Sequence, residues 1–547
     1  MNDFSLSSLL LAAALAVPIA MLLACLWRPW LDRLPSLLWL APVPALAASL
    51  FAVRGPPLVL GNTPFLMTVA LDVPGAMLLG VAALLWIAAG VYASSSLLGH
   101  PHPGRFSVCW LLTLTGNIGV FMTADLASFY LAFALVSIPA YGLVVRDGTP
   151  QAQRAGAIYM ALTLLGENLL LIGFVLLAAG VPGGSLEIRD CVAALAKSPW
   201  RDPALALLVA GFGLKAGLVP LHVWMPVTYS AAPIPAAAVL SGAAVKAGVI
   251  GLIRFLPLGQ ELPGWGGALA IAGLLSAFYG VAVGLTQSNP KTVLAYSSVS
   301  QMGLIAAVLC VGLANGDRDA ATAAAFYAER HILVKGALFL VVGLVAATGS
   351  CRLWSALFPA TILALSLGGL PITGGALAKL AVKGTLGEGA VATLATIAAA
   401  GTTLLMLHFL RCLQRTVGQD LERGSQRGLL SPWLAMVFAS VVIPVALFPV
   451  AGFGSPVDAL APAALGAALS PILLGGILAL GLRRLMPRLP SLPEGDILVA
   501  GEAAARASVA WGAALERAEM VLQRWPVACL LLLIIAITLG AVTLVGR

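Results

Sequence analysis

Charged residues are scarce in this chain. Asp, Glu, Lys and Arg make up 10% of its 547 residues, whereas hydrophobic residues make up 60%. A soluble globular protein carries about 25% charged residues, and the mean hydropathy here is +1.01. This composition excludes an ordinary soluble domain and predicts a polytopic membrane protein. The net charge of +8 comes from basic residues scattered over loops, without the basic patch that nucleic-acid binding requires.

The chain also lacks the signatures of a metal, redox or nucleotide centre. Its seven cysteines lie far apart, and no two have the spacing of zinc or iron–sulfur ligands: Cys25, Cys109, Cys191, Cys310, Cys351, Cys412 and Cys529. The string Gly-Phe-Gly-Leu-Lys-Ala-Gly (211–217) has the wrong spacing for a dinucleotide fingerprint, and no predicted strand precedes it. We therefore expect no cofactor, no metal and no catalytic centre in this chain.

Long apolar runs are abundant instead. About 14–16 of them reach the roughly 20 residues that cross a bilayer, with one or two uncertain in the region 350–390. They are continuous rather than alternating, which predicts an all-α membrane protein. The first run (6–27) follows Asp3 and no basic segment, so we expect a retained helix rather than a cleaved signal. Loops rich in Arg and Lys alternate with poorer ones, which predicts that both termini lie outside the cytoplasm.

A few charged residues stand inside these apolar runs. An isolated charge at bilayer depth costs roughly 2.5–3.5 kcal/mol, so six of them predict side chains that face one another inside the bundle. They are Glu167, Lys215, Lys246, His331, Lys335 and Lys379. Such a pattern favours a proton or ion pathway.

Two of these lysines stand beside predicted helix breaks. Glycines precede Lys215 and prolines follow it, from Gly211 to Pro235, and the run 368–379 combines glycines, a proline and Lys379. Broken helices at membrane depth line cavities and bind ions in transporters. Two such segments also suggest two related halves. His222, just past the first break, and Lys383, after the second, are accessory candidates.

Tyr327, His331 and Lys335 recur every four residues and therefore share one helix face, along which a proton can be relayed. Tyr327 is an accessory candidate. The alternative is that these are packed polar residues bonded to loop carbonyls. For Glu167 the alternative is a hydrogen bond between neighbouring helices, whereas Lys246 stands in mid-helix and is hard to explain by its side chain reaching the interface.

Four segments together resemble the antiporter-like family found in respiratory complex I, group 4 membrane hydrogenases and Mrp-type sodium/proton antiporters. The matching strings are Lys-Ala-Gly-Leu-Val-Pro-Leu-His-Val-Trp-Met-Pro (215–226), Ala-Ala-Pro-Ile-Pro-Ala-Ala-Ala-Val-Leu-Ser (231–241), Lys-Thr-Val-Leu-Ala-Tyr-Ser-Ser-Val-Ser-Gln-Met-Gly (291–303) and residues 331–340. The resemblance covers roughly 105–415.

The resemblance implies two inverted five-helix repeats, each with a broken helix, and a central file of lysines and histidines that carries protons. Lys215 and Lys379 then correspond to the lysines of the two broken helices, Lys246 to the lysine of the next helix, and His331 and Lys335 to the central relay. The expected parts of the chain are N-terminal helices (1–104), two repeats (105–256 and 257–415), C-terminal helices (416–485), an amphipathic surface helix (486–525) and a final span (526–547). An ordinary cytoplasmic helical loop is the alternative for 486–525.

One departure from the family pattern concerns the first repeat. The family carries a glutamate on its fifth helix that pairs with the first lysine, and that position here is Ala134. Glu167 on the following helix is our expected replacement. The departure also raises the alternative that this half does not conduct.

These observations predict a proton-translocating membrane subunit of a multisubunit complex in the inner (plasma) membrane. A complex I-like or hydrogenase-type redox-driven pump is the leading interpretation, in which partner subunits handle the electrons. The alternatives are a subunit of a Mrp-type cation/proton antiporter, the proton-driven membrane partner of a zinc-containing inorganic-carbon uptake protein, and a non-conducting scaffold.

Overall fold

The computed structural model of the protein describes residues 5–31, 33–61, 66–96, 103–348, 353–418, 426–484, 490, 492–499, 501 and 516. These residues belong to two compact units, 1–494 and 495–547. Few residues of the second unit are described. The predicted final span (526–547) and most of the predicted surface helix (486–525) therefore lie outside the described residues.

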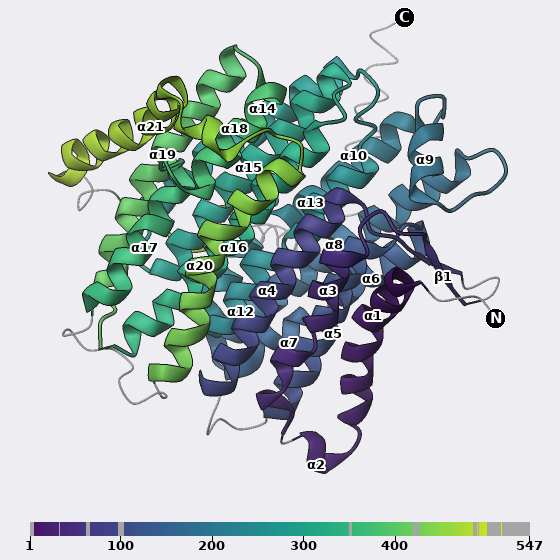
Figure 1. The fold of residues 1–547 in the computed structure, drawn as a ribbon, viewed down its shortest axis with the longest axis horizontal. Coiled ribbons are helices and arrows are strands. Elements are labelled where there is room, and N and C mark those ends of the chain that lie inside the picture. Colours follow the sequence, from purple (N-terminus) through teal and green to yellow (C-terminus); the bar gives the residue numbers. More distant parts are fainter. Residues whose placement is uncertain are drawn as a thin grey trace, which may run out of the picture. The chain divides into compact units, whose positions relative to one another are not determined.

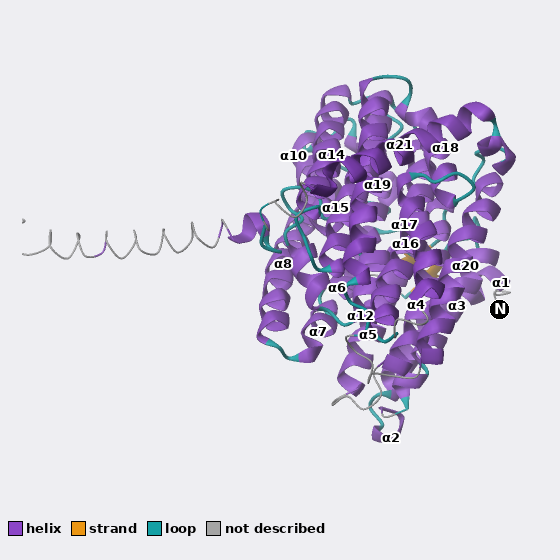
Figure 2. Cartoon of the chain, turned by 90° about the vertical axis from the view of Figure 1, so that its left-hand side faces the viewer, coloured by secondary structure: helices purple, strands orange, loops and turns teal. Residues whose placement is uncertain are grey.

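The first unit is built almost entirely of helices (Figures 1 and 2). Its N-terminal part contains α1 (Leu6–Ala24), α2 (Arg28–Leu31), α3 (Val43–Phe51) and α4 (Val73–Ser96). The middle part contains α5 (Pro103–Met122), α6 (Leu126–Ser137), α7 (Ala140–Val144), α8 (Pro150–Ala179), α9 (Ile188–Leu195), α10 (Arg201–Ala216), α11 (Trp224–Ala231), α12 (Ile234–Val239) and α13 (Lys246–Phe255). The last part contains α14 (Pro263–Gly284), α15 (Pro290–Asn315), α16 (Ala320–Ala346), α17 (Leu353–Gly368), α18 (Gly374–Leu386), α19 (Ala390–Gln414), α20 (Gln426–Val450) and α21 (Pro462–Gly481).

The structure confirms an all-α membrane protein. Eleven helical segments of the described chain are long and apolar enough to cross a bilayer. Other expected spans are divided into shorter pieces: the uncertain region 350–390 is α17 followed by α18. The one sheet among the described residues is a hairpin of three-residue strands, β1 (Leu58–Leu60) and β2 (Met67–Val69). The boundaries of the two predicted repeats stay a prediction.

The sequence supplies a stop or start signal at many helix ends. Asp125 caps α6 by accepting a hydrogen bond from the Ser128 amide at 2.8 Å, and it also accepts one from the Thr68 amide of β2. Thr149 caps α8 in the same manner, directly before a proline at the first helical position. Such caps satisfy amides that have no partner within the helix.

Two helices are interrupted inside the bundle, as the sequence predicts. The first break, residues 217–223, lies between α10 and α11, and Gly217 ends α10 in the left-handed conformation (φ 75°). The second break, residues 369–373, lies between α17 and α18 and begins with Gly369 (φ 95°). Positive φ favours glycine at both positions because a Cβ would be strained there.

The helix α16 lies at the centre of the unit and packs against α4, α15, α17, α18 and α20 (Figure 1). Almost all of its side chains are buried, charged ones included. The charged residues of the run 327–335 are therefore buried within protein.

The pair α14 and α15 packs through small residues. Gly266, Gly273 and Gly280 recur every seven residues along α14, and each faces the backbone of α15. An added Cβ at Gly273 would meet the carbonyl oxygen of Gly303 at 2.6 Å. Close backbone approach through glycine is typical of helix packing in membranes.

We therefore expect Gly273→Leu to separate α14 from α15 and to lower the free energy of unfolding by about 1–3 kcal/mol, the usual cost of overpacking. Gly267 is the matched control, because nothing lies within 4 Å of an added Cβ there. The measurement is the thermal midpoint of each variant in detergent. Equal midpoints for Gly273→Leu and Gly267→Leu would contradict this packing.

Candidate functional site

A lysine and a histidine from different helices meet in the middle of the bundle. The Nζ of Lys246, at the start of α13, lies 2.6 Å from Nδ1 of His331 in α16, and both side chains are fully buried. A π-helical turn (Leu240–Ala244) precedes Lys246. Such turns are frequent at functional sites. The contact joins residues 85 positions apart and connects Lys246 directly to His331 of the predicted central relay.

Lys335 lies one helical turn beyond His331 on α16. Its ammonium donates to the carbonyl oxygen of Leu294 at 2.7 Å and contacts Oγ of Ser297, both in α15. Its side chain is fully buried. Lys335 is therefore anchored by neutral oxygens, and no carboxylate forms an ion pair with it within the described chain.

Lys215 is the penultimate residue of α10, directly before the first break. Its Nζ donates to Oγ of Ser137 in α6 at 2.8 Å and lies 5.6 Å from the ring centre of Phe133 and 5.9 Å from that of Tyr159. Cation–π contacts and one hydroxyl thus replace water around this ammonium. Ser137 was not among the predicted site residues, since nothing distinguishes it from other serines in an apolar run.

Glu167 of α8 lines the same small cavity as Lys215 and Ser137. It is 4% exposed, and neither carboxylate oxygen has a hydrogen-bond partner. Among the described residues, no ion pair within 4 Å joins Glu167 to Lys215. The two groups are brought together in one cavity, but their functional pairing stays a prediction.

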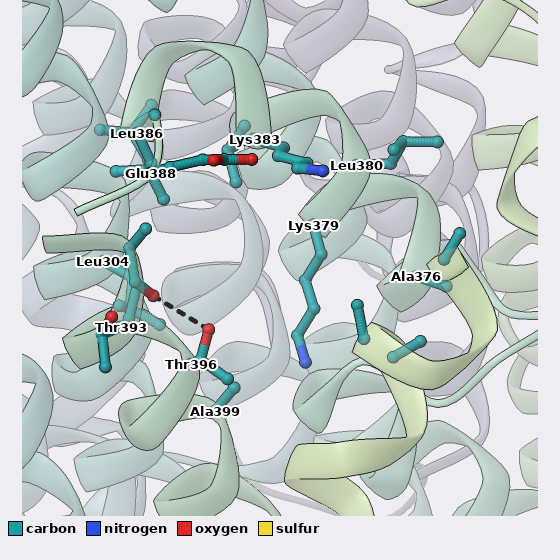
Figure 3. A pocket seen from close by; sticks show the side chains of 18 of the residues that line it. Leu304, Ala376, Lys379, Leu380, Lys383, Leu386, Glu388, Thr393, Thr396 and Ala399 are labelled. Atoms are coloured by element: carbon teal, nitrogen blue, oxygen red, sulfur yellow. Dashed lines mark hydrogen bonds between the residues drawn. The ribbon is translucent and has the colours of Figure 1, made fainter. Parts of the chain in front are cut away.

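Lys379 lies in α18, after the second break, and lines a cavity of about 650 Å³. Figure 3 shows its side chain extending from α18 into this cavity, away from Lys383 and Glu388. Its Nζ is buried and has no hydrogen-bond partner, and it packs against Gly369 of the break. The cavity is also lined by Thr393 and Thr396 of α19 and by alanines of α21: Ala463, Ala464, Ala467 and Ala468.

The accessory candidates differ in their surroundings. Tyr327 is buried, and its hydroxyl donates to Oε1 of Gln301 in α15 at 3.0 Å. His222 is fully buried in the first break, and its ring centre lies 5.0 Å from that of Tyr279 and 6.1 Å from that of Tyr296. Lys383 is exposed and lines the cavity of Lys379.

Two buried charges on α16 were missed by sequence reasoning. Arg330 is 1% exposed and donates to the carbonyl oxygen of Ser366 at 2.9 Å and to Oε1 of Gln301 at 3.0 Å. Glu329 is fully buried, and neither of its carboxylate oxygens has a hydrogen-bond partner. The available signal was their position inside the run 327–340, directly before His331.

A third missed residue, Glu494, comes from outside both predicted repeats. Its carboxylate accepts hydrogen bonds from three side chains at the ends of α11 and α15: Ser230 at 2.8 Å, Thr292 at 2.7 Å and Asn289 at 3.3 Å. Its carbonyl oxygen accepts one from the Tyr296 hydroxyl, and that of Leu492 accepts one from Gln287. Glu494 therefore fastens residues 492–494 across the seam between α11 and α15.

The buried basic groups comprise a central cluster and one lysine near each helix break, and their connection into one file stays a prediction. Lys246, His331 and Lys335 form the central cluster, and Lys215 and Lys379 stand at the first and second breaks. The described residues contain no cluster of three or more histidine, cysteine or carboxylate side chains that could hold a metal ion. Lysine and histidine side chains can accept and release protons, so proton transfer is the chemistry available to these groups.

Comparison with known proteins identifies a family and several relatives of this chain. The family model described as NADH:quinone oxidoreductase/Mrp antiporter, TM, matches residues 123–405. NADH-quinone oxidoreductase subunit N of Desulforudis audaxviator is 31% identical over 391 residues, which cover 66% of this chain and 75% of that protein. Hydrogenase-4 component B of Escherichia coli is 30% identical over 291 residues, or 51% of this chain and 43% of that protein. This chain spans between 36% and 46% of the length of several of the curated relatives it matches.

The fold has a counterpart among solved structures. A chain in the structure of the Mrp complex from Dietzia sp. DQ12-45-1b superposes with a TM-score of 0.77 at 20% identity, over 99% of this chain and 63% of that one. At this identity the likeness concerns the fold.

We expect Glu494→Ala to free residues 492–494 from the seam, because three side-chain donors lose their acceptor. A hydrogen bond to a charged group contributes a net stabilisation of about 1.5–3 kcal/mol. The measurement is the rate of limited proteolysis between residues 485 and 500, which should rise several-fold. Glu388→Ala is the control, since Glu388 is exposed. Unchanged cleavage in Glu494→Ala would contradict the fastening role.

Proposed function

This chain belongs to the NADH:quinone oxidoreductase/Mrp antiporter transmembrane family, and we propose that it is a proton-translocating membrane subunit of a multisubunit complex. A redox reaction carried out by partner subunits supplies the energy, as in complex I-like or hydrogenase-type pumps. The observation that carries the proposal is the buried hydrogen bond between Lys246 and His331, flanked by a lysine at each helix break.

Proton transfer begins at the first break. Lys215 holds its charge against an apolar surrounding through Ser137 and two aromatic rings. A charged Glu167 in the same cavity favours the protonated lysine, and movement of the two groups apart favours proton release. The proton then passes inward to Lys246.

The central step needs little motion. Lys246 and His331 already share a hydrogen bond, and two positive charges at this distance repel strongly in a medium of low dielectric constant. The pair therefore favours a single positive charge, with one of the two groups protonated and the other neutral. A proton arriving from Lys215 drives the previous one on to Lys335.

The last step is release at the second break. Lys379 has no hydrogen-bond partner in the described structure, and the cavity it lines is large enough for water. A proton on Lys379 can therefore pass to water in this cavity. Water molecules are the proposed carriers between Lys215 and Lys246 and between Lys335 and Lys379.

We also propose that the chain lies in the inner (plasma) membrane with both termini on the non-cytoplasmic side. The support is the alternation of basic and poorly charged loops, in which Arg146, Arg154 and Lys291 mark the cytoplasmic side. A membrane-impermeant label on an N-terminal tag tests this orientation in intact cells.

The partners distinguish the proposed function from its alternatives. Purification of the tagged chain in mild detergent, followed by mass spectrometry, is expected to recover quinone-reductase or hydrogenase subunits. Small antiporter subunits would favour a Mrp-type antiporter instead, and a zinc protein would favour inorganic-carbon uptake. In both of those cases proton flux drives the process rather than results from it.

Neutralising Lys335 distinguishes a conductor from a scaffold. We expect Lys335→Ala to lower proton transport at least tenfold while the complex still assembles. The proposed path then loses the titratable side chain that follows His331 and is anchored to α15 by the carbonyl of Leu294. Lys383→Ala, which removes an exposed lysine, should transport normally. Full transport by Lys335→Ala would support the scaffold.

Glu167 tests the departure at Ala134. If Glu167 replaces the missing glutamate, Glu167→Gln should impair transport nearly as much as Lys215→Ala. Both residues line one cavity, so the variants remove the two charges of the same site. Proton transport in inverted membrane vesicles is the measurement, and near-normal transport by Glu167→Gln would rule out this role.

A further inference from the structure

The two helix breaks share a backbone feature, but the side-chain donors that bind it differ in charge. In each, the carbonyl oxygen two residues before the helix end accepts a hydrogen bond from a distant side chain. At the first break this oxygen belongs to Leu214, and the donor is the neutral indole of Trp224 at 2.8 Å. At the second break it belongs to Ser366, and the donor is the guanidinium of Arg330 at 2.9 Å.

The C-terminal end of a helix inside a membrane attracts cations. Its last carbonyl groups have no partner within the helix and carry a partial negative charge. In transporters with broken helices, such half-helix ends and unwound carbonyls coordinate Na⁺. At the end of α17, the Ser366 carbonyl accepts the Gly369 amide at 2.9 Å and the Leu365 carbonyl accepts the Leu370 amide at 3.2 Å. A carbonyl oxygen has two lone pairs, so the Ser366 oxygen can still bind a second donor or a cation in the interior of the bundle.

The guanidinium of Arg330 occupies this position through its two terminal nitrogens, and its Nε has no hydrogen-bond partner among the described residues. Besides Ser366, its guanidinium binds Oε1 of Gln301 at 3.0 Å, and its Cζ lies 4.5 Å from the ring centre of Tyr327. Its aliphatic stem packs beside Gly374, the first residue of α18, where an added Cβ would lie 3.5 Å from Cγ. The side chain therefore spans the second break from the end of α17 to the start of α18.

The oxygens around Arg330 would suit an alkali cation if the side chain were absent. The carbonyl of Ser366 and the amide oxygen of Gln301 are neutral oxygen ligands. The neighbouring residue on α16, Glu329, adds a fully buried carboxylate that has no hydrogen-bond partner among the described residues. Hard cations prefer oxygen ligands of these kinds. A guanidinium, unlike a lysine or histidine, keeps its charge at every physiological pH and cannot carry protons onward.

We propose that Arg330 is a built-in cation that fills a sodium-type site at the second break and so makes the file selective for protons over Na⁺ and K⁺. The inference rests on the proposed function for its meaning in transport, but not for its test. Protons bypass Arg330 by moving among titratable groups and water. A metal cation needs the oxygens that Arg330 holds.

The test is Na⁺ binding to the purified chain in complex with its native partners. Arg330→Ser vacates the site and keeps the oxygens of Ser366 and Gln301. We expect NaCl, but not choline chloride at equal ionic strength, to raise the thermal midpoint of Arg330→Ser by several degrees. The native protein and Arg330→Lys, which retains a positive charge, should show no such difference between the two salts.

Arg330→Gln is the second variant, in case Arg330→Ser does not fold. It is also neutral, and guanidinium chloride at millimolar concentration should stabilise either neutral variant by refilling the site. Folded neutral variants that respond equally to NaCl and choline chloride would overturn the proposal. A Na⁺ response of the native protein would overturn it as well, because the site would then not be filled.

The outcome is separable from that of the proposed function. Absence of proton transport by the native complex would contradict the proposed function and leave the binding result unaffected. Normal proton transport, combined with neutral variants that do not respond to Na⁺, would refute the role of Arg330 alone.

Discussion

The arrangement of the buried lysine and histidine side chains depends on the free-energy cost of burying positive charge in an apolar bundle. Lys246, His331 and Lys335 are fully buried, and no carboxylate forms an ion pair with them within the described chain. Lys246 instead contacts the ring nitrogen Nδ1 of His331, and Lys335 contacts a carbonyl oxygen and a hydroxyl. Such surroundings stabilise a charge less than a carboxylate does, so a proton held there stays transferable.

The cost of burying polar groups also applies to the two helix breaks. A break exposes backbone carbonyls in the bundle interior, and each of these must find a donor. Backbone amides of the breaks donate to the carbonyls of Leu214 and Ser366. The side chains of Trp224 and Arg330 supply a second donor to these two oxygens. The lysine near each break does not bind these carbonyls. Lys215 donates to Ser137 instead, and Lys379 extends into a cavity.

The sequence predicts much of this arrangement because its strongest signals are local. Run length marks the spans, glycine and proline mark both breaks, and lysines in apolar surroundings mark Lys215 and Lys379. The contact between Lys246 and His331 depends on tertiary packing, which no local pattern encodes. That these two residues belong to one proton pathway was implied only by resemblance to a family. The hairpin of β1 and β2 was not predicted, since three-residue strands leave no periodic pattern.

The residues that sequence reasoning missed act across long separations. Arg330 stands beside Glu329 in the chain and looks like half of a local charge pair, but its partners are Gln301 and Ser366. Glu494 reaches residues about 200 positions earlier in the chain. No local pattern encodes such contacts, because they depend on how helices are placed in three dimensions.

The most direct test is proton flux in proteoliposomes that contain the purified complex, energised by its own electron donor and acceptor. A pH-sensitive dye reports the flux while valinomycin and K⁺ hold the membrane potential at zero. We predict that the pH gradient forms at the same rate with and without Na⁺ and that His331→Ala abolishes it. A gradient that forms only with Na⁺, or one that persists in His331→Ala, would contradict a proton file through the centre of this chain.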